Sequence, residues 1–142
     1  GWECPITQPD VLASAYGVRA GVWAYMATGD EQWLDDARYW ARTGLAFQYA
    51  WDDGQHPGMR YASIPVFGST FFHHSWIGLP VQWCGLVYAY SLQELRRFDD
   101  SDIWHKQAEG ITVSAMYQQW PMDHETLAGS YPDSWGNWFT QR

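Results

Sequence analysis

Residues 9–47 read PDVLASAYGVRAGVWAYMATGDEQWLDDARYWARTGLAF, and this stretch decides the fold that we predict. Over residues 9–28, apolar side chains occur nearly all round the helical projection, and Arg19 is the only charge after Asp10. Such a helix is expected to be buried on all sides. Residues 31–48 carry one apolar stripe and one charged face, which is typical of a helix exposed on one side. The Gly-Asp turn between them is short, so the two helices form an antiparallel hairpin.

The same order occurs a second time. Residues 80–98 predict another mostly apolar helix, and residues 102–119 predict another amphipathic helix after a short turn. At an offset of 71 positions, three identities support the repeat: Pro9 and Pro80, Trp33 and Trp104, Ala37 and Ala108. The sequence therefore predicts a single all-α unit of two hairpin repeats, residues 1–71 and 72–142, that buries its faces by stacking on neighbouring hairpins.

The lengths of the connections predict where the chemistry lies. Both turns inside the hairpins are short, so the three long segments 1–8, 49–79 and 120–136 must share the opposite end of the bundle. The middle segment is rich in glycine, proline and aromatic residues, which favours an ordered loop. Within it, residues 60–66 and 69–74 are predicted to form a short β-hairpin. The alternative is a structural flap that packs its rings on its own domain.

Composition excludes some partners. The formal charge is −8 with a single lysine, which disfavours a nucleic-acid partner. No apolar run reaches membrane-spanning length, so no membrane partner is expected.

The chain lacks an initiator Met and a signal-peptide pattern, so we expect that it begins after processing or is a piece of a longer protein. Cys4 and Cys84 match no metal or redox motif, and a disulfide between them is one alternative. The 11 tryptophans exceed what a core needs, and the surplus suits stacking on flat ligand faces.

The hairpin segments resemble a known architecture. The two stretches at 9–47 and 78–104 (GLPVQWCGLVYAYSLQELRRFDDSDIW) are similar in style to hairpins of the (α/α)6 toroid, the six-hairpin glycosidase-like superfamily, and TGDEQWLDDARYWA at 28–41 is the closest piece. The resemblance covers most of the chain but only two hairpins of six. It implies that the 9–28 and 80–98 helices line a central funnel, that loops at its mouth act on an oligo- or polysaccharide, and that the rest of a longer chain or other copies complete the toroid. A secreted or periplasmic location would suit this function.

Two reactions fit the loop residues. Glycoside hydrolysis uses paired carboxylates. The candidates are Glu3, Asp52, Asp53 and Asp133, and Asp123 and Glu125 are further candidates. A polysaccharide lyase instead uses a His or Tyr base and a cation or polar group that holds the sugar carboxylate. The candidates are His73, His74, Tyr61, Tyr131 and Arg60. The further candidates for substrate binding are Trp51, Trp76, Trp135 and His124.

Simpler interpretations stand beside these. Asp52-Asp53-Gly54 has the composition of a solvated turn, and Asp133 could cap a helix that begins at about residue 137. His73 and His74 would point to opposite faces of a strand. A metal site from His73, His74 and residues 123–125 has no recognised ligand spacing, so neither a metal nor another cofactor is predicted. The competing function is a non-enzymatic helical-repeat binding module, although its usual periods are shorter. A terpene-cyclase-like toroid is disfavoured, because its aspartate motifs are absent.

Overall fold

The computed structural model describes residues 9–66 and 79–136, and its regular structure there is entirely helical. In chain order, the elements are α1 (Val11–Thr28), α2 (Gln32–Gly44), the short 3₁₀ helix η1 (Leu45–Phe47), α3 (Gln82–Leu95) and α4 (Asp102–Gln118). The predicted all-α class is confirmed, and each predicted helix is present with boundaries shifted by a few residues. The largest difference is at the end of α2, where the last predicted turn tightens into η1.

Local chemistry sets the ends of α1. The side chain of Asp10 accepts a hydrogen bond from the backbone N–H of Ala13 at 2.6 Å, which satisfies one of the free donors at the start of the helix. At the other end, Gly29 has a φ of 71°, and its N–H donates to the carbonyl of Tyr25. Glycine adopts this left-handed conformation without steric cost. The chain therefore leaves α1 sharply and enters α2 after a short turn.

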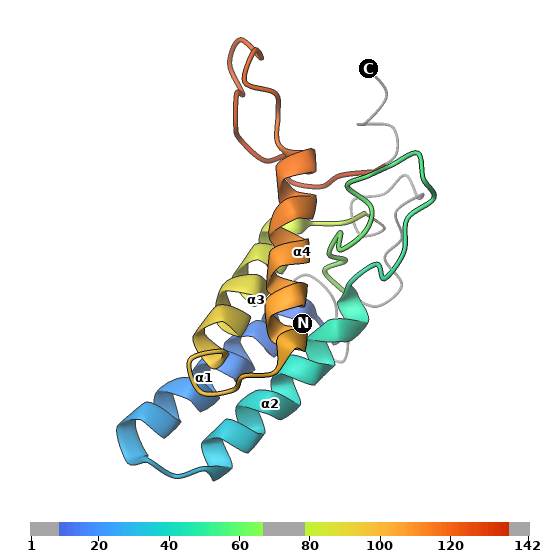
Figure 1. The fold of residues 1–142 in the computed structure, drawn as a ribbon. Coiled ribbons are helices and arrows are strands. Elements are labelled where there is room, and N and C mark those ends of the chain that lie inside the picture. The colour runs from blue at the N-terminus through green and yellow to red at the C-terminus, as the bar shows by residue number, and fades with distance from the viewer. Residues whose placement is uncertain (1–8, 67–78, 137–142) are drawn as a thin grey trace.

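The helices pack in the order α2, α1, α3, α4, because α1 contacts both α2 and α3, and α3 contacts α4 (Figure 1). Small residues allow close approach at these contacts. A Cβ on Gly21 would lie 2.9 Å from the Cβ of Ala37, and one on Gly44 would lie 2.3 Å from the ring of Tyr88. Tyr88 is fully buried and its hydroxyl donates to the carbonyl of Ala41, which ties α3 to α2.

Two ion pairs reinforce this packing at the sides of the bundle. Arg19 on α1 donates from Nε to Glu94 Oε2 on α3 at 3.0 Å. Arg38 on α2 donates from Nε to Asp99 Oδ2 at 2.9 Å, which joins α2 to the turn before α4. Both pairs are partly buried, so salt screens them less than it screens a fully exposed pair.

The structure corrects the expectation that the helix at 9–28 is buried on all sides. One stripe of α1 is open to solvent and carries Tyr16 and Trp23, which are 56% and 54% exposed. On α3, Tyr90 is 56% exposed, and the guanidinium of Arg19 lies over both the Trp23 and the Tyr90 rings. The apolar character of α1 thus exceeds what its contacts with α2 and α3 bury, and these aromatic side chains of α1 and α3 remain exposed among the described residues.

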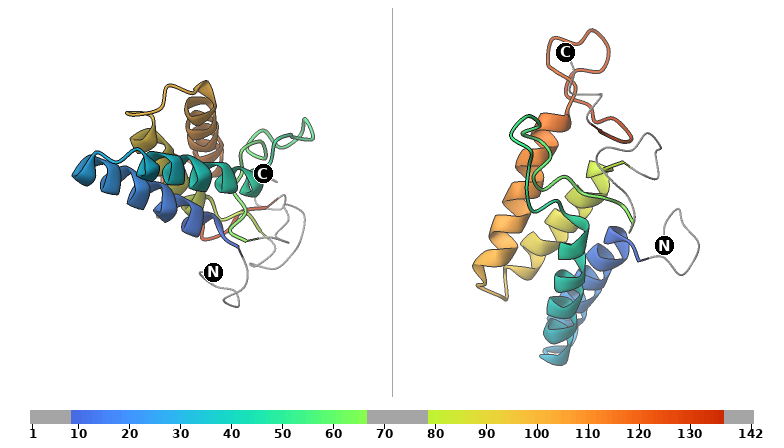
Figure 2. Two further views of the ribbon diagram at one scale, coloured as in Figure 1. Left: turned by 90° about the horizontal axis from the view of Figure 1, so that it is seen from below. Right: turned by 90° about the vertical axis from the view of Figure 1, so that its right-hand side faces the viewer.

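The described parts of the long segments lie at one end of the bundle, as the alternation of short and long connections predicts. The turns after α1 and α3 occupy one end, while residues 48–66 and 119–136 occupy the other, and the views in Figure 2 agree. The backbone N–H of Trp135 donates to the carbonyl of Pro80 at 2.9 Å, which joins the last segment to the start of α3. Residues 1–8 lie outside the described part.

The predicted strand at 60–66 is wrong. This segment makes only isolated bridges, Gln48 with Ser63 and Asp10 with Val66, and forms no strand. Its backbone bonds go to several different segments instead, among them the N–H of Ile64 to the carbonyl of Phe47 at 2.9 Å. The other half of the predicted β-hairpin, residues 69–74, lies outside the described residues.

Candidate functional site

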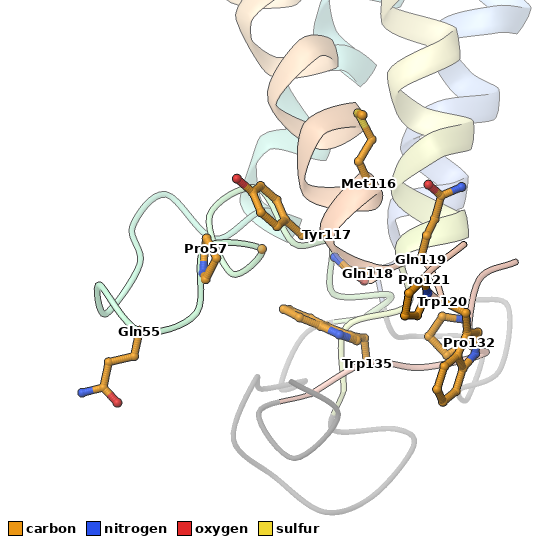
Figure 3. A pocket seen from close by; sticks show the side chains of 11 residues that line it. Gln55, Pro57, Met116, Tyr117, Gln118, Gln119, Trp120, Pro121, Pro132 and Trp135 are labelled. Atoms are coloured by element: carbon orange, nitrogen blue, oxygen red, sulfur yellow. The ribbon is translucent and has the colours of Figure 1, made fainter. Parts of the chain in front are cut away.

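Two cavities lie between the 52–61 loop and α4, and Pro57 lines both. The first, here called the neutral pocket, has a volume of about 400 Å³ and is formed by Gln55, Pro57, Gly58, Met116, Tyr117, Gln118, Gln119, Trp120, Pro121, Pro132 and Trp135 (Figure 3). The second, the charged pocket, has a volume of about 550 Å³ and is formed by Asp52, Gly54, Pro57, Arg60, Tyr61, Lys106, Glu109, Gly110, Val113 and Ser114. The 52–61 loop and α4 contribute walls to both.

Asp52 and Asp53 shape the loop that enters the charged pocket. Asp52 Oδ1 accepts from the N–H of Gly54 at 3.0 Å, and Asp53 Oδ1 accepts from the N–H groups of Gln55 and His56 at 3.0 and 2.9 Å. These are the local bonds by which aspartate stabilises a turn. The predicted turn is therefore present, and Asp52 both stabilises this turn and lines the charged pocket.

Asp53 is paired with His56. The distance between Asp53 Oδ2 and His56 Nδ1 is 2.6 Å. Desolvation raises the pKa of Asp53, but the hydrogen bonds from Gln55 and His56 outweigh it, so the pKa lies below its ordinary value. A carboxyl group with a lowered pKa is ionised at neutral pH and is poorly suited to donate a proton. In this arrangement Asp53 orients the imidazole of His56.

Tyr61 forms a wall of the charged pocket with an unusual backbone. Its φ is 64°, a left-handed conformation that non-glycine residues adopt rarely. Its N–H donates to the carbonyl of Tyr49 at 2.8 Å, and its carbonyl accepts from Gln82 Nε2 at 3.3 Å. The ring lies against Gly110 of α4, where a Cβ would come within 2.5 Å of it. The position of Tyr61 is thus set by α3, α4 and the start of the loop together.

Gln82 is the central residue of a buried polar network beneath the two pockets. Its Oε1 accepts from the N–H of Ser63 at 2.8 Å and from Gln118 Nε2 at 2.9 Å, while its Nε2 also donates to the carbonyl of Ile111 at 3.0 Å. The donors and acceptors of the backbone fix the orientation of the Gln82 amide, which in turn fixes that of Gln118. Gln82 therefore connects the 61–63 segment to α4.

The network continues from Gln118 to the neutral pocket. Gln118 Nε2 also donates to Ser114 Oγ at 3.1 Å, and Ser114 Oγ donates to the carbonyl of Gly58 at 2.6 Å. Gln118 is only 3% exposed, and its buried Oε1 has no hydrogen-bond partner among the described residues. A buried acceptor without a partner typically costs about 1–3 kcal/mol. Gln118 therefore lines the neutral pocket, while its Oε1 is buried away from solvent.

The structure brings together part of the predicted site. Asp52, Arg60 and Tyr61 line the charged pocket. Trp135 lines the neutral pocket but is only 4% exposed and packs against Met59, so it serves mainly as core. Trp51 is 55% exposed and lines neither pocket.

The other predicted residues are apart from the two pockets. Asp133 is exposed and lines neither of them. The imidazole of His124 lies 4.8 Å from the Trp120 ring, and its Nδ1 accepts from the backbone N–H groups of Thr126 and Leu127. These bonds give His124 a structural task in its own loop. Glu3, His73, His74 and Trp76 lie outside the described residues.

Sequence reasoning missed the contribution of α4. Lys106 and Glu109 line the charged pocket, and Tyr117 and Gln118 line the neutral one. The helical pattern places Lys106 and Glu109 on the outer face, which is correct, but it gives no sign that the 52–61 loop folds over that face. The result is that two carboxylates, Asp52 and Glu109, border one cavity together with two cations.

Neither a metal centre nor a membrane span is found in the described ranges. There, no group of three or more His, Cys, Asp or Glu side chains could hold a metal ion. No helix in these ranges is both long and apolar enough to cross a bilayer. Comparisons of the chain with known protein families, with curated proteins and with solved structures find no match.

Proposed function

We propose that the chain is part of a carbohydrate-active enzyme, a glycoside hydrolase whose loop end binds an oligo- or polysaccharide. One observation carries the proposal: Asp52 and Glu109 border the same cavity, next to a second pocket with aromatic walls. Glycoside hydrolysis needs a carboxyl group that protonates the leaving oxygen and a second carboxylate that activates water or attacks the sugar. Asp52 and Glu109 are the pair proposed for these tasks.

The aromatic face of α1 and α3 supports a partial toroid. In the (α/α) architecture each hairpin packs against neighbouring hairpins around a central funnel. Tyr16 and Trp23 on α1 and Tyr90 on α3 are exposed in the described part of the chain. Soluble domains rarely leave a large contiguous apolar patch open. We therefore propose that further hairpins, from the rest of a longer chain or from other copies, cover this face.

A polysaccharide lyase is the second candidate, because Arg60 and Tyr61 border the charged pocket side by side. A lyase removes the proton next to a sugar carboxylate, and a tyrosine base with a nearby guanidinium would suit this step. The left-handed backbone of Tyr61 adds weight, since residues held in rare conformations cluster at functional sites.

Incubation with a panel of polysaccharides separates the two reactions. A hydrolase releases reducing ends without unsaturated product, whereas a lyase produces an ultraviolet-absorbing double bond. We expect the hydrolase result, with Asp52→Asn and Glu109→Gln each reducing the rate by about 100-fold or more. Asp53→Asn and Asp133→Asn are expected to have smaller effects.

The matched control is Asp100→Asn, a loss of one exposed carboxylate in the turn at the opposite end of the bundle. Its rate should equal that of the unmodified chain. Full activity in both Asp52→Asn and Glu109→Gln would rule out this pair as the catalytic carboxylates. Turnover with unsaturated product that depends on Tyr61 would establish the lyase instead.

A further inference from the structure

The two pockets adjoin along one face of α4. Val113 lines the charged pocket, and Met116 and Tyr117 line the neutral pocket. Residues that lie three or four positions apart are neighbours on a helix surface, so the two pockets come within one turn of each other on α4. Pro57 of the 52–61 loop also lines both of them. The two cavities therefore share the helix and the loop as walls.

The part of α4 that borders the cavities is long compared with one sugar ring. It begins at Lys106, which lines the charged pocket, and continues to Gln118 at the end of the helix, which lines the neutral pocket. With a helical rise of about 1.5 Å per residue, these two positions are about 18 Å apart along the axis. This span is several times the width of a pyranose ring, so it fits several linked sugar units better than a single one.

The α4 side of both pockets is open to solvent. Val113, Met116 and Tyr117 are 46%, 65% and 57% exposed, although all three are large apolar or aromatic side chains. The side chains of Lys106 and Glu109 are 71% and 64% exposed. An accessible aromatic ring stacks on the C–H face of a sugar, and charged groups form hydrogen bonds with its hydroxyls. A ligand along this face thus finds suitable contacts in both pockets, and the end of the face at Lys106 opens to solvent.

The loop that forms the other wall is attached to α4 at two places. Ser114 Oγ donates to the carbonyl of Gly58 at 2.6 Å, and the ring of Tyr61 packs against Gly110. Gly58 lies so close to the helix that a Cβ added to it would be 2.9 Å from the Cβ of Tyr117. These contacts fix the loop relative to α4, so both pockets are formed before a ligand binds. A preformed site loses less entropy on binding than one that must be ordered first.

We propose that the two pockets are consecutive parts of one groove that binds several linked sugar units of a polysaccharide, and that the polysaccharide is cut at an internal bond. This inference rests on the proposed hydrolase function and adds to it the polymeric substrate and the position of the cut. Asp52 and Glu109 border the charged pocket, so the units bound in the neutral pocket lie to one side of the cleaved bond. On the other side, the polysaccharide continues past Lys106 into solvent.

The cut itself is an ordinary hydrolysis. The bond between the anomeric carbon and the bridging oxygen breaks, the anomeric carbon gains the hydroxyl of a water molecule, and the bridging oxygen gains a proton. Because sugar units are bound on both sides of that bond, each product is an oligosaccharide or a longer chain. An enzyme with a site for a chain end would instead release single sugars.

Isothermal titration calorimetry of the full chain with ligands of increasing length tests the groove. The probes run from the disaccharide to the hexasaccharide in four series: cello-, xylo- and manno-oligosaccharides and oligogalacturonates. Glu109→Gln serves as the background, so that the ligands are bound without being consumed. We expect affinity in at least one series to rise about tenfold or more with length, because the longer ligands reach the second pocket.

One variant shows whether the second pocket holds the longer ligands. Tyr117→Ala removes the exposed ring but keeps the Cβ beside Gly58, and it should weaken hexasaccharide binding about tenfold. The ratio of hexasaccharide to disaccharide affinity should fall with it, which a general loss of folded protein would not cause. Tyr39→Ala is the control, because Tyr39 is a similarly exposed tyrosine on α2 that lines neither pocket.

Viscometry locates the cut in a polymer. The substrates are carboxymethylcellulose, arabinoxylan, glucomannan and polygalacturonate, with reducing ends counted in the same samples. A cut at internal bonds lowers the viscosity steeply while few reducing ends have formed, and its early products are oligosaccharides. Release of single sugars from chain ends leaves the viscosity nearly unchanged at the same count.

The results separate this inference from the proposed function. Length-dependent binding that is lost in Tyr117→Ala supports the groove even if no polysaccharide is hydrolysed. Hydrolysis that depends on Asp52 and Glu109 but releases only single sugars would leave the hydrolase proposal intact and overturn the inference. Affinity that does not change with length, no binding in any series, or equal hexasaccharide binding by Tyr117→Ala and its background also overturns it.

Discussion

Replacing Gln82 by leucine should destabilise the protein well beyond the loss of one surface amide. Gln82 is 3% exposed and takes part in hydrogen bonds with Ser63, Gln118, Tyr61 and Ile111. Leucine fills a similar volume but can make none of these bonds. The most costly loss is at the Ser63 N–H, because Ser63 is fully buried and, within the described ranges, Gln82 is the partner of this donor.

The magnitude follows from which partners keep another bond. An unsatisfied buried donor costs about 1–3 kcal/mol, and each remaining bond contributes about 1 kcal/mol or less after relaxation. Gln118 Nε2 keeps its hydrogen bond to Ser114 Oγ, so it loses one of its two bonds. We therefore expect Gln82→Leu to lower the free energy of unfolding by about 3 kcal/mol. The 61–63 segment, which carries Tyr61, should loosen at the same time.

Urea denaturation followed by far-ultraviolet circular dichroism measures the change. Gln93→Leu is the control, since Gln93 lies on the same helix, is exposed, and accepts a hydrogen bond from the side chain of Arg96. Its effect should stay within about 0.5 kcal/mol. A loss below about 1 kcal/mol in Gln82→Leu would refute the argument, because it would mean that the Ser63 N–H finds a replacement partner at little cost.

Three further predictions concern the site loop, the core and the turn after α1. Asp53→Asn should be less stable than the unmodified chain at pH 6, because hydrogen bonds from the loop and from His56 lower the pKa of Asp53. The stability that this carboxylate contributes is present above the ordinary carboxyl pKa and is lost as the pH falls through the lowered pKa. The urea midpoints of the two proteins should therefore converge in acid, and a difference that persists there would contradict the assignment. Gly44→Ala should cost about 1–3 kcal/mol, since the new methyl group would overlap the Tyr88 ring. Gly29→Ala meets no neighbour within 4 Å and should lose only about 1 kcal/mol through its left-handed backbone, which thermal melts of both variants can check.

The helices could be predicted from the sequence because periodicity and end signals agree there. Asp10 and Gly29 mark the ends of α1 by chemistry that depends on local bonds alone. The gathering of the long connections at one end also follows from the alternation of short and long turns. Periodicity could not predict which apolar side chains of α1 are buried. The surfaces of α2 and α3 cover only part of α1, so Tyr16 and Trp23 remain exposed.

The site was only partly predictable, for a different reason. Asp52, Arg60 and Tyr61 are recognisable as polar or aromatic residues in a loop, but the other wall comes from α4, about 50 residues further along the chain. The strand expected at 60–66 fails because Tyr61 takes a left-handed backbone and bonds to Tyr49 and Gln82. The fold of this loop over α4 leaves no trace in residue spacing.

The turn between α1 and α2 offers a practical opening. Gly29 follows α1 in the turn at the opposite end of the bundle from the 52–61 and 120–136 loops (Figure 1), and a Cβ added to it would have no neighbour within 4 Å. A fluorescent label, an affinity tag or an inserted domain placed there would leave the 52–61 and 120–136 loops free. The protein could thus be immobilised through the turn between α1 and α2, with the 52–61 and 120–136 loops directed into solution for ligand screening.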